Sequence, residues 1–163
     1  MIVSIECANK EVKLLNEYKA RLLALENSNK AWVSTDVDKE ADRPEYDFKD
    51  TQEKIMKTVA KICDIKHKVN LFNISHVLPC GLTVDSALVR MTMLNDRANT
   101  LSRLSMMSDK IRMTHVQGEG KLYQYRNFDA AEAEAELTVL QREILTIQTQ
   151  INEANLQNHI EIE

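Results

Sequence analysis

Four long segments of this 163-residue chain repeat apolar residues every three or four positions, which is the period of an α-helix. They cover about residues 5–32, 48–72, 83–107 and 129–154. The whole chain contains only 3 Gly and 2 Pro, so the tight turns of an all-β fold would lack their usual residues. The pattern therefore predicts a mainly α-helical protein.

The second half of the chain resembles the first, which indicates an internal duplication. Two amphipathic helices can always be aligned on their apolar stripes, but matched helix caps and matched polar residues need a further explanation. At shifts of 79 and 82 positions the matches are Ser4 with Thr83, Leu15-Asn16-Glu17 with Leu94-Asn95-Asp96, Ile62 with Ile144, and Asn73 with Asn155. We predict one helical domain over 1–163, with repeat one at 4–73 and repeat two at 83–158.

Residues 109–127 lack the helical period. Short β-prone runs stand on both sides of Gln117-Gly118-Glu119-Gly120, a pattern typical of a β-hairpin. We predict a small β-hairpin insertion here, between the third and fourth helices. The complete prediction is an elongated antiparallel four-helix bundle or coiled coil, made of two duplicated helical hairpins.

The fourth helical segment carries a heptad seam of apolar residues. Its members alternate in steps of three and four along the helix: Leu137, Leu140, Ile144, Ile147 and Ile151. A seam of this kind packs against another helix, in the same chain or in a second copy. We therefore expect a homo-oligomer, and a non-enzymatic role as a self-assembling interaction or structural protein.

Six of the aromatic residues lie in or beside the two long connections between helices. They are Trp32, Tyr46, Phe48, Tyr123, Tyr125 and Phe128. Aromatic residues gathered in this way form either a small local core or a binding patch, because Tyr and Trp are common in interface hot spots. We favour a local core, and expect contacts with partner chains at this end of the molecule.

A metal site is the alternative from another functional class. Cys63 and His67 are four residues apart, and His76 and Cys80 repeat that spacing. Two thiolates and two imidazoles suit tetrahedral zinc, which would make the chain a metal-binding or metal-sensing protein. The duplicated half has no copy of this set, so we expect buried cysteines, surface histidines and no cofactor.

Composition and motifs exclude several other classes. A net charge of −4 argues against nucleic-acid binding, which needs a surplus of Lys and Arg. No apolar run approaches the length of a membrane span, and no secretory signal opens the chain. An odd count of three cysteines fits a reducing, cytoplasmic compartment. No catalytic motif is present, so we expect no enzymatic activity, and the sequence names no small-molecule ligand.

Several short motifs resemble those of a family of small, functionally uncharacterised bacterial coiled-coil proteins, some of them labelled septicolysin-like. The similar segments are Val69-Asn70-Leu71-Phe72-Asn73, Leu78-Pro79-Cys80-Gly81-Leu82-Thr83, Ala87-Leu88, Leu94-Asn95-Asp96-Arg97, Tyr125-Arg126-Asn127-Phe128-Asp129 and Ile151-Asn152-Glu153-Ala154-Asn155. The resemblance covers most of the chain. It implies a helical, oligomerising cytoplasmic protein, and no lytic motif accompanies it.

Overall fold

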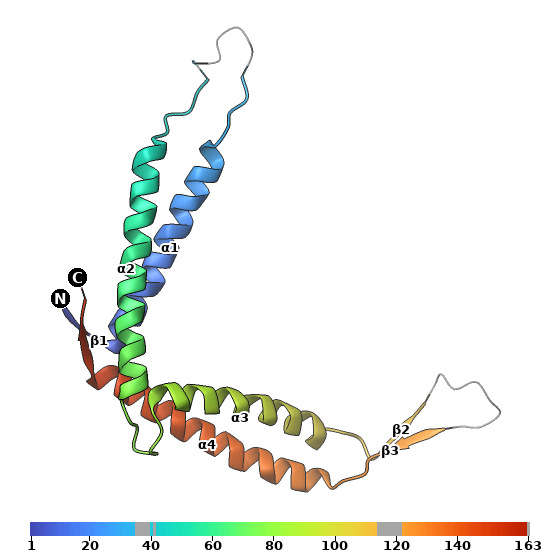
Figure 1. Cartoon of the computed structure of the whole chain (residues 1–163). Coiled ribbons are helices and arrows are strands. Elements are labelled where there is room, and N and C mark those ends of the chain that lie inside the picture. Colours follow the sequence, from blue (N-terminus) through green and yellow to red (C-terminus); the bar gives the residue numbers. More distant parts are fainter. Residues whose placement is uncertain (35–39, 41, 114–121, 163) are drawn as a thin grey trace. The chain divides into compact units, whose positions relative to one another are not determined.

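The computed structural model describes residues 1–34, 40, 42–113 and 122–162. These residues are mainly helical and contain four helices, as the sequence predicts (Figure 1). The chain divides into two compact units. Unit 1 consists of Met1–His76 and Asn152–Glu163, and unit 2 of Val77–Ile151. Packing of the four helices into one bundle and one domain stays a prediction.

Unit 1 is built on α1 (Ile5–Asn29) and α2 (Phe48–Ser75), which lie side by side (Figure 1). Local capping explains where both helices begin. The Ser4 hydroxyl accepts the N–H of Cys7 at 3.2 Å, and the Asp47 carboxylate accepts the N–H of Asp50 at 2.9 Å. The first two helices therefore begin where the sequence predicts, at Ile5 and Phe48.

The core of unit 1 lies near the end of the helical pair that contains the chain termini. Its buried members come from both helices and from the C-terminal segment: Ile5, Ala8, Val12, Ile62, Ile65, Val69 and Ile162. Farther along α1 the apolar stripe opens to solvent, since Tyr18 and Leu25 are exposed. Leu22 and Ile55 are nevertheless buried in that part of the hairpin, so packing between the two helices continues beyond the terminal cluster.

The two ends of the chain meet in unit 1. Strand β1 (Ile2–Ser4) pairs antiparallel with β4 (His159–Glu161). The Met1 amino group donates a hydrogen bond of 2.6 Å to the Ile162 carbonyl, and the Ile162 N–H donates one of 2.9 Å to the Met1 carbonyl. This pairing joins residues at opposite ends of the sequence, and sequence periodicity did not indicate it.

Unit 2 contains α3 (Val84–Ser105) and most of α4 (Ala130–Gln157), which lie side by side (Figure 1). Between them, β2 (Lys110–Arg112) pairs antiparallel with β3 (Tyr123–Tyr125). Both strands fall in the segment predicted to form a β-hairpin. The predicted turn at 117–120 lies outside the described residues.

Corresponding strand pairings occur in the two units at the shifts found by sequence comparison. In unit 1, Ser4 pairs with His159; in unit 2, Thr83 pairs with Val77. Thr83 lies 79 positions after Ser4, and His159 lies 82 positions after Val77. Ser4 and Thr83 also share one cap geometry, with φ −65° and ψ 157° against φ −66° and ψ 157°. These matches support the predicted duplication.

A circular permutant tests this equivalence. The present termini are joined by a short Gly-Ser linker, and new termini are opened between Cys80 and Gly81, in the turn that corresponds to the present chain ends. Because only a turn is interrupted and the old ends already touch, we expect native helicity and a Tm within a few degrees of the parent. Circular dichroism measures both. A control opened between Lys61 and Ile62, inside α2, should lose stability, and equal disruption of both permutants would contradict the equivalence.

Candidate functional site

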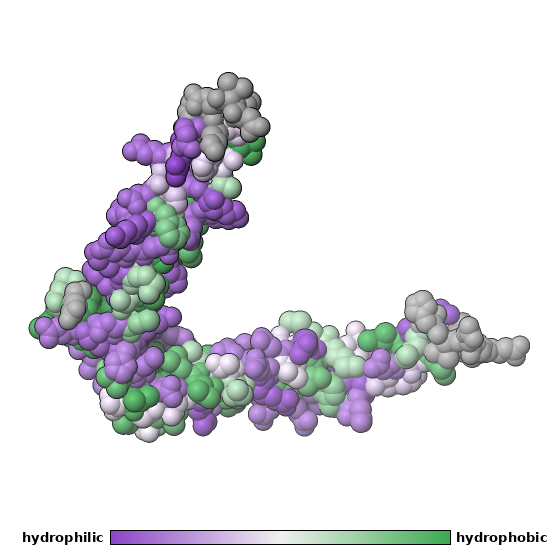
Figure 2. Space-filling model, turned by 45° about the horizontal axis from the view of Figure 1, so that its top comes forward, coloured by the Kyte–Doolittle hydropathy of each residue, from purple (hydrophilic) through white to green (hydrophobic). Residues whose placement is uncertain are grey.

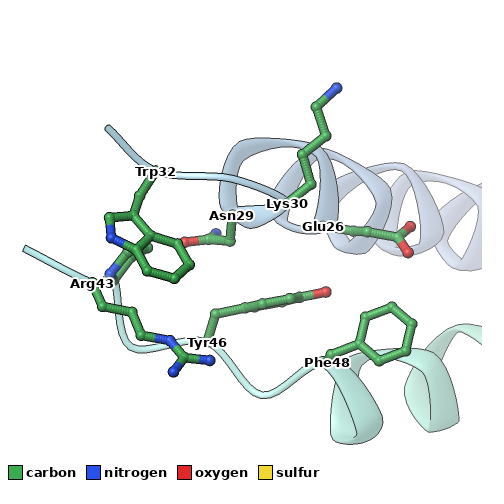
Figure 3. A pocket seen from close by; sticks show the side chains of 8 residues that line it. Glu26, Asn29, Lys30, Trp32, Arg43, Tyr46 and Phe48 are labelled. Atoms are coloured by element: carbon green, nitrogen blue, oxygen red, sulfur yellow. The ribbon is translucent and has the colours of Figure 1, made fainter. Parts of the chain in front are cut away.

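A pocket of about 310 Å³ lies in unit 1, where α1 ends and α2 begins (Figure 3). Its walls come from the last turn of α1, the two ends of the connection and the first residue of α2. The lining residues are Glu26, Asn29, Lys30, Trp32, Arg43, Pro44, Tyr46 and Phe48. Three of the six aromatic residues singled out in the sequence are therefore brought together here.

Two charged residues that line this pocket, Glu26 and Arg43, contact other side chains. The Glu26 carboxylate accepts a hydrogen bond of 2.6 Å from the Gln52 amide, which holds it against α2. The Arg43 guanidinium carbon lies 5.2 Å from the centroid of the Trp32 ring, and Nη1 lies 3.4 Å from the Glu40 carboxylate. A guanidinium has five donors, so Arg43 keeps capacity for a further anion.

The Tyr46 hydroxyl is buried and has no hydrogen-bond partner within the described residues. A buried polar group without a partner costs about 1–3 kcal/mol. The neighbouring rings are more open, since Trp32 is 39 % and Phe48 is 61 % exposed. This exposure favours a binding patch over a closed local core for these two residues.

The other three aromatic residues belong to unit 2, at and after β3. The Lys110 ammonium lies 4.0 Å from the centroid of the Tyr123 ring and 5.4 Å from that of Tyr125. The Arg126 guanidinium carbon lies 5.7 Å from the centroid of the Phe128 ring. Both cations thus cover aromatic faces of their own unit. Arg126 also forms an ion pair with Asp109 and donates a hydrogen bond of 2.9 Å to the Met107 carbonyl, which ties β2 to β3 at their base.

A groove of about 440 Å³ runs along α3 and α4 in unit 2. It is lined by Met91, Asn95, Ala98, Asn99, Ser102, Leu137, Gln141, Ile144, Leu145 and Gln148. Beside it, Arg90 and Glu143 join the two helices through an ion pair of 2.6 Å. The five residues of the predicted heptad seam differ in burial. Ile147 and Ile151 are buried, whereas Leu137, Leu140 and Ile144 are half-buried.

The cysteines and histidines of the alternative metal hypothesis do not form a metal site in the structure. Cys63 and Cys80 are exposed, so the expectation of buried cysteines is wrong. Cys63 follows Ile62 by one residue and has turned off the buried stripe of α2. The His76 ring instead stacks on Phe72, with centroids 4.9 Å apart. Among the described residues, no group of three or more His, Cys, Asp or Glu side chains could hold a metal ion.

Charged residues of α1 and α2 pair along their own helices. Three lysine–carboxylate pairs have N–O distances of 2.6 Å at a spacing of four residues: Lys10 with Glu6, Lys54 with Asp50, and Lys57 with Glu53. The side-chain hydrogen bond to the carboxylate raises the pKa of each lysine. These pairs favour helix formation on solvent-exposed faces and none of them lines the pocket.

Five lining residues of the pocket were not predicted from the sequence: Glu26, Asn29, Lys30, Arg43 and Pro44. They lie on both sides of one long connection. In an antiparallel helical hairpin the end of the first helix and the start of the second must meet, so this topology is the signal that could have found them.

No family model matches the chain, and no curated protein matches it either. A solved structure is similar: a functionally unknown conserved protein from Corynebacterium diphtheriae, with a TM-score of 0.76 and 16 % sequence identity. The similarity covers 99 % of this chain and 100 % of that one. At this identity the likeness establishes the mainly helical fold alone. No helix in the described residues has the length and apolar character needed to cross a membrane.

Thiol chemistry tests the metal hypothesis directly. Because Cys7, Cys63 and Cys80 are all exposed, we expect three thiols per chain to react with an aromatic disulfide reagent without denaturant. Added Zn²⁺ should leave the rates unchanged, and elemental analysis of untagged protein should give less than about 0.2 metal ions per chain. Protection of two thiols by stoichiometric zinc would restore the Cys/His site.

Proposed function

We propose that the protein is a non-enzymatic, self-assembling helical protein, and that unit 2 pairs with the same unit of a second copy through the α3–α4 groove. One observation carries this proposal. The ten residues that line the groove include no charged side chain, in a chain of which 28 % is charged. Depletion of charge is the compositional mark of an interface centre.

The duplication supplies an internal comparison for the apolar groove residues. Met91, Leu137 and Ile144 are half-buried in unit 2. Their equivalents in unit 1 at the shifts of 79 and 82 are Val12, Ile55 and Ile62, which are only 9 %, 8 % and 7 % exposed. At these three positions the stripe is more exposed in unit 2 than in unit 1, as is expected of a surface that a further chain covers.

Two positions of the groove are uncharged in unit 2 and charged in unit 1. Ala98 and Gln148 line the groove of unit 2, whereas the equivalent positions of unit 1 hold Lys19 and Lys66. Lysine at such a position resists association, because its ammonium must be desolvated or paired. Unit 2 has no lysine charge to desolvate at either position, since these are Ala98 and Gln148.

A pair of helices forms a single layer, and a single layer buries only one stripe of each helix. Apolar residues consequently reach the surface along α3 and α4, where green patches lie among the purple of hydrophilic residues (Figure 2). Leu145, at the edge of the groove, is 67 % exposed. Two copies related by a twofold axis would bury this face against itself and produce a four-helix arrangement. Burial of one Leu side chain contributes roughly 1.5–3 kcal/mol.

A pair of substitutions on α4 tests this interface. Leu145→Glu places a carboxylate in the groove, so we expect association to weaken at least tenfold while helicity is kept. Val139→Glu is the matched control, because Val139 is 58 % exposed and does not line the groove. Sedimentation velocity over a dilution series measures the association. A monomeric parent, or an equal loss for both variants, would contradict the proposal.

Ile147 tests packing inside the chain instead. It lies on α4, is 3 % exposed and does not line the groove. Ile147→Asp buries a carboxylate, so we expect a loss of about 3–5 kcal/mol in the free energy of unfolding, with reduced helicity. Ile147→Val should cost only about 0.5–1.5 kcal/mol. Urea titration followed by circular dichroism measures both, and a fully stable Ile147→Asp would show that this part of the seam is not core.

A further inference from the structure

We propose that the outer edge of β3 pairs with β3 of a second copy of this chain, as a contact separate from the α3–α4 groove. Every residue of β2 and β3 is exposed. One face of this hairpin is apolar and consists of Ile111, Met113 and Leu122, all of which are exposed. A two-stranded sheet with no further strand or helix against it is marginal in water, so the hairpin would be stabilised by an added strand.

The hydrogen bonds within the hairpin identify the backbone groups that point away from it. The Arg126 N–H donates a hydrogen bond of 3.0 Å to the Asp109 carbonyl, at the base of the two strands. In an antiparallel pair, hydrogen-bonded positions of this kind alternate with positions whose N–H and C=O groups face outward. Tyr123 and Tyr125 therefore hold the outward positions of β3. Within the described residues, their four backbone groups make no hydrogen bond.

Charge distinguishes this edge from the other edge of the hairpin. Strand β3 has the sequence Tyr-Gln-Tyr and carries no charge, whereas β2 is Lys-Ile-Arg. Charged side chains on an edge strand resist the addition of a further strand. Two β2 edges would place Lys110 of one copy opposite Arg112 of the other, and like charges directly opposite each other are destabilising. Two β3 edges meet no such repulsion, so the charge distribution favours β3.

A second copy of β3 matches this edge residue by residue. Antiparallel pairing centred on Gln124 places Tyr123 of each copy opposite Tyr125 of the other, so their outward N–H and C=O groups can exchange hydrogen bonds. The apolar face of the hairpin then extends over four strands. Both outer edges of this sheet are β2, whose charges resist further growth, so the pairing closes at two copies.

A cysteine at the centre of the pairing tests it. In a chain whose Cys7, Cys63 and Cys80 are replaced by Ser, Gln124→Cys places two thiols across a non-hydrogen-bonded pair, where Cα atoms lie about 4.5 Å apart. This separation suits a disulfide, so we expect the purified protein to form a covalent dimer in air, as measured by non-reducing electrophoresis. Ile111→Cys is the control. Three strand spacings, about 14 Å, separate its two thiols, so it should cross-link at least tenfold more slowly.

A double variant separates this contact from pairing of the grooves. Leu145 lines the groove and is not part of the hairpin, so Gln124→Cys with Leu145→Glu should cross-link at the same rate as Gln124→Cys alone. A failure of groove pairing would therefore leave the cross-link unchanged. Absence of a covalent dimer, with helicity kept, would overturn the self-pairing and is the result expected if the edge takes a strand of another protein. Equal rates for Gln124→Cys and Ile111→Cys, or a dimer lost with Leu145→Glu, would also overturn it.

Discussion

A helical hairpin can bury only one stripe of each helix, and this limit governs the rest of the structure. In unit 1 the stripes of α1 and α2 pack together near the chain termini, where Ile162, from the C-terminal segment, completes a cluster with Ile5 and Val69. In unit 2 part of the stripe, including Leu137 and Ile144, remains at the surface as an uncharged groove. Self-association is the most direct way for such a face to be removed from water.

The predicted duplication, followed by divergence, would explain why two similar hairpins have different surfaces. The shared elements are backbone features: the caps at Ser4 and Thr83 and the strand pairings beside them. The differences are in side chains, such as Lys66 against Gln148. Unit 1 has a pocket between its helix ends, whereas unit 2 has a groove along its helices. We propose that the groove of unit 2 serves assembly.

The helices could be predicted because their signals are local. A period of 3.6 residues and a cap such as Ser4 are visible within a few turns of chain. The β1–β4 pairing could not, because it joins three-residue strands from opposite ends of the sequence. Cys63 was wrongly expected to be buried, since one residue turns the helix by about 100° away from Ile62. The pocket could be predicted only in part. Trp32 belongs to the predicted aromatic cluster, but its contact with Arg43 depends on how the connection between α1 and α2 folds.

Two methionines of α3 offer the most direct test of self-association through unit 2. Met91 lines the groove, whereas Met93 is 62 % exposed outside the groove lining. With methyl-labelled methionine, a soluble paramagnetic agent reports the solvent access of each methyl group. If two grooves pair, the relaxation enhancement that the agent causes at the Met91 methyl group should fall as protein concentration rises. The enhancement at the Met93 methyl group should stay constant. Equal and unchanged relaxation of both methyl groups across the concentration range would contradict it.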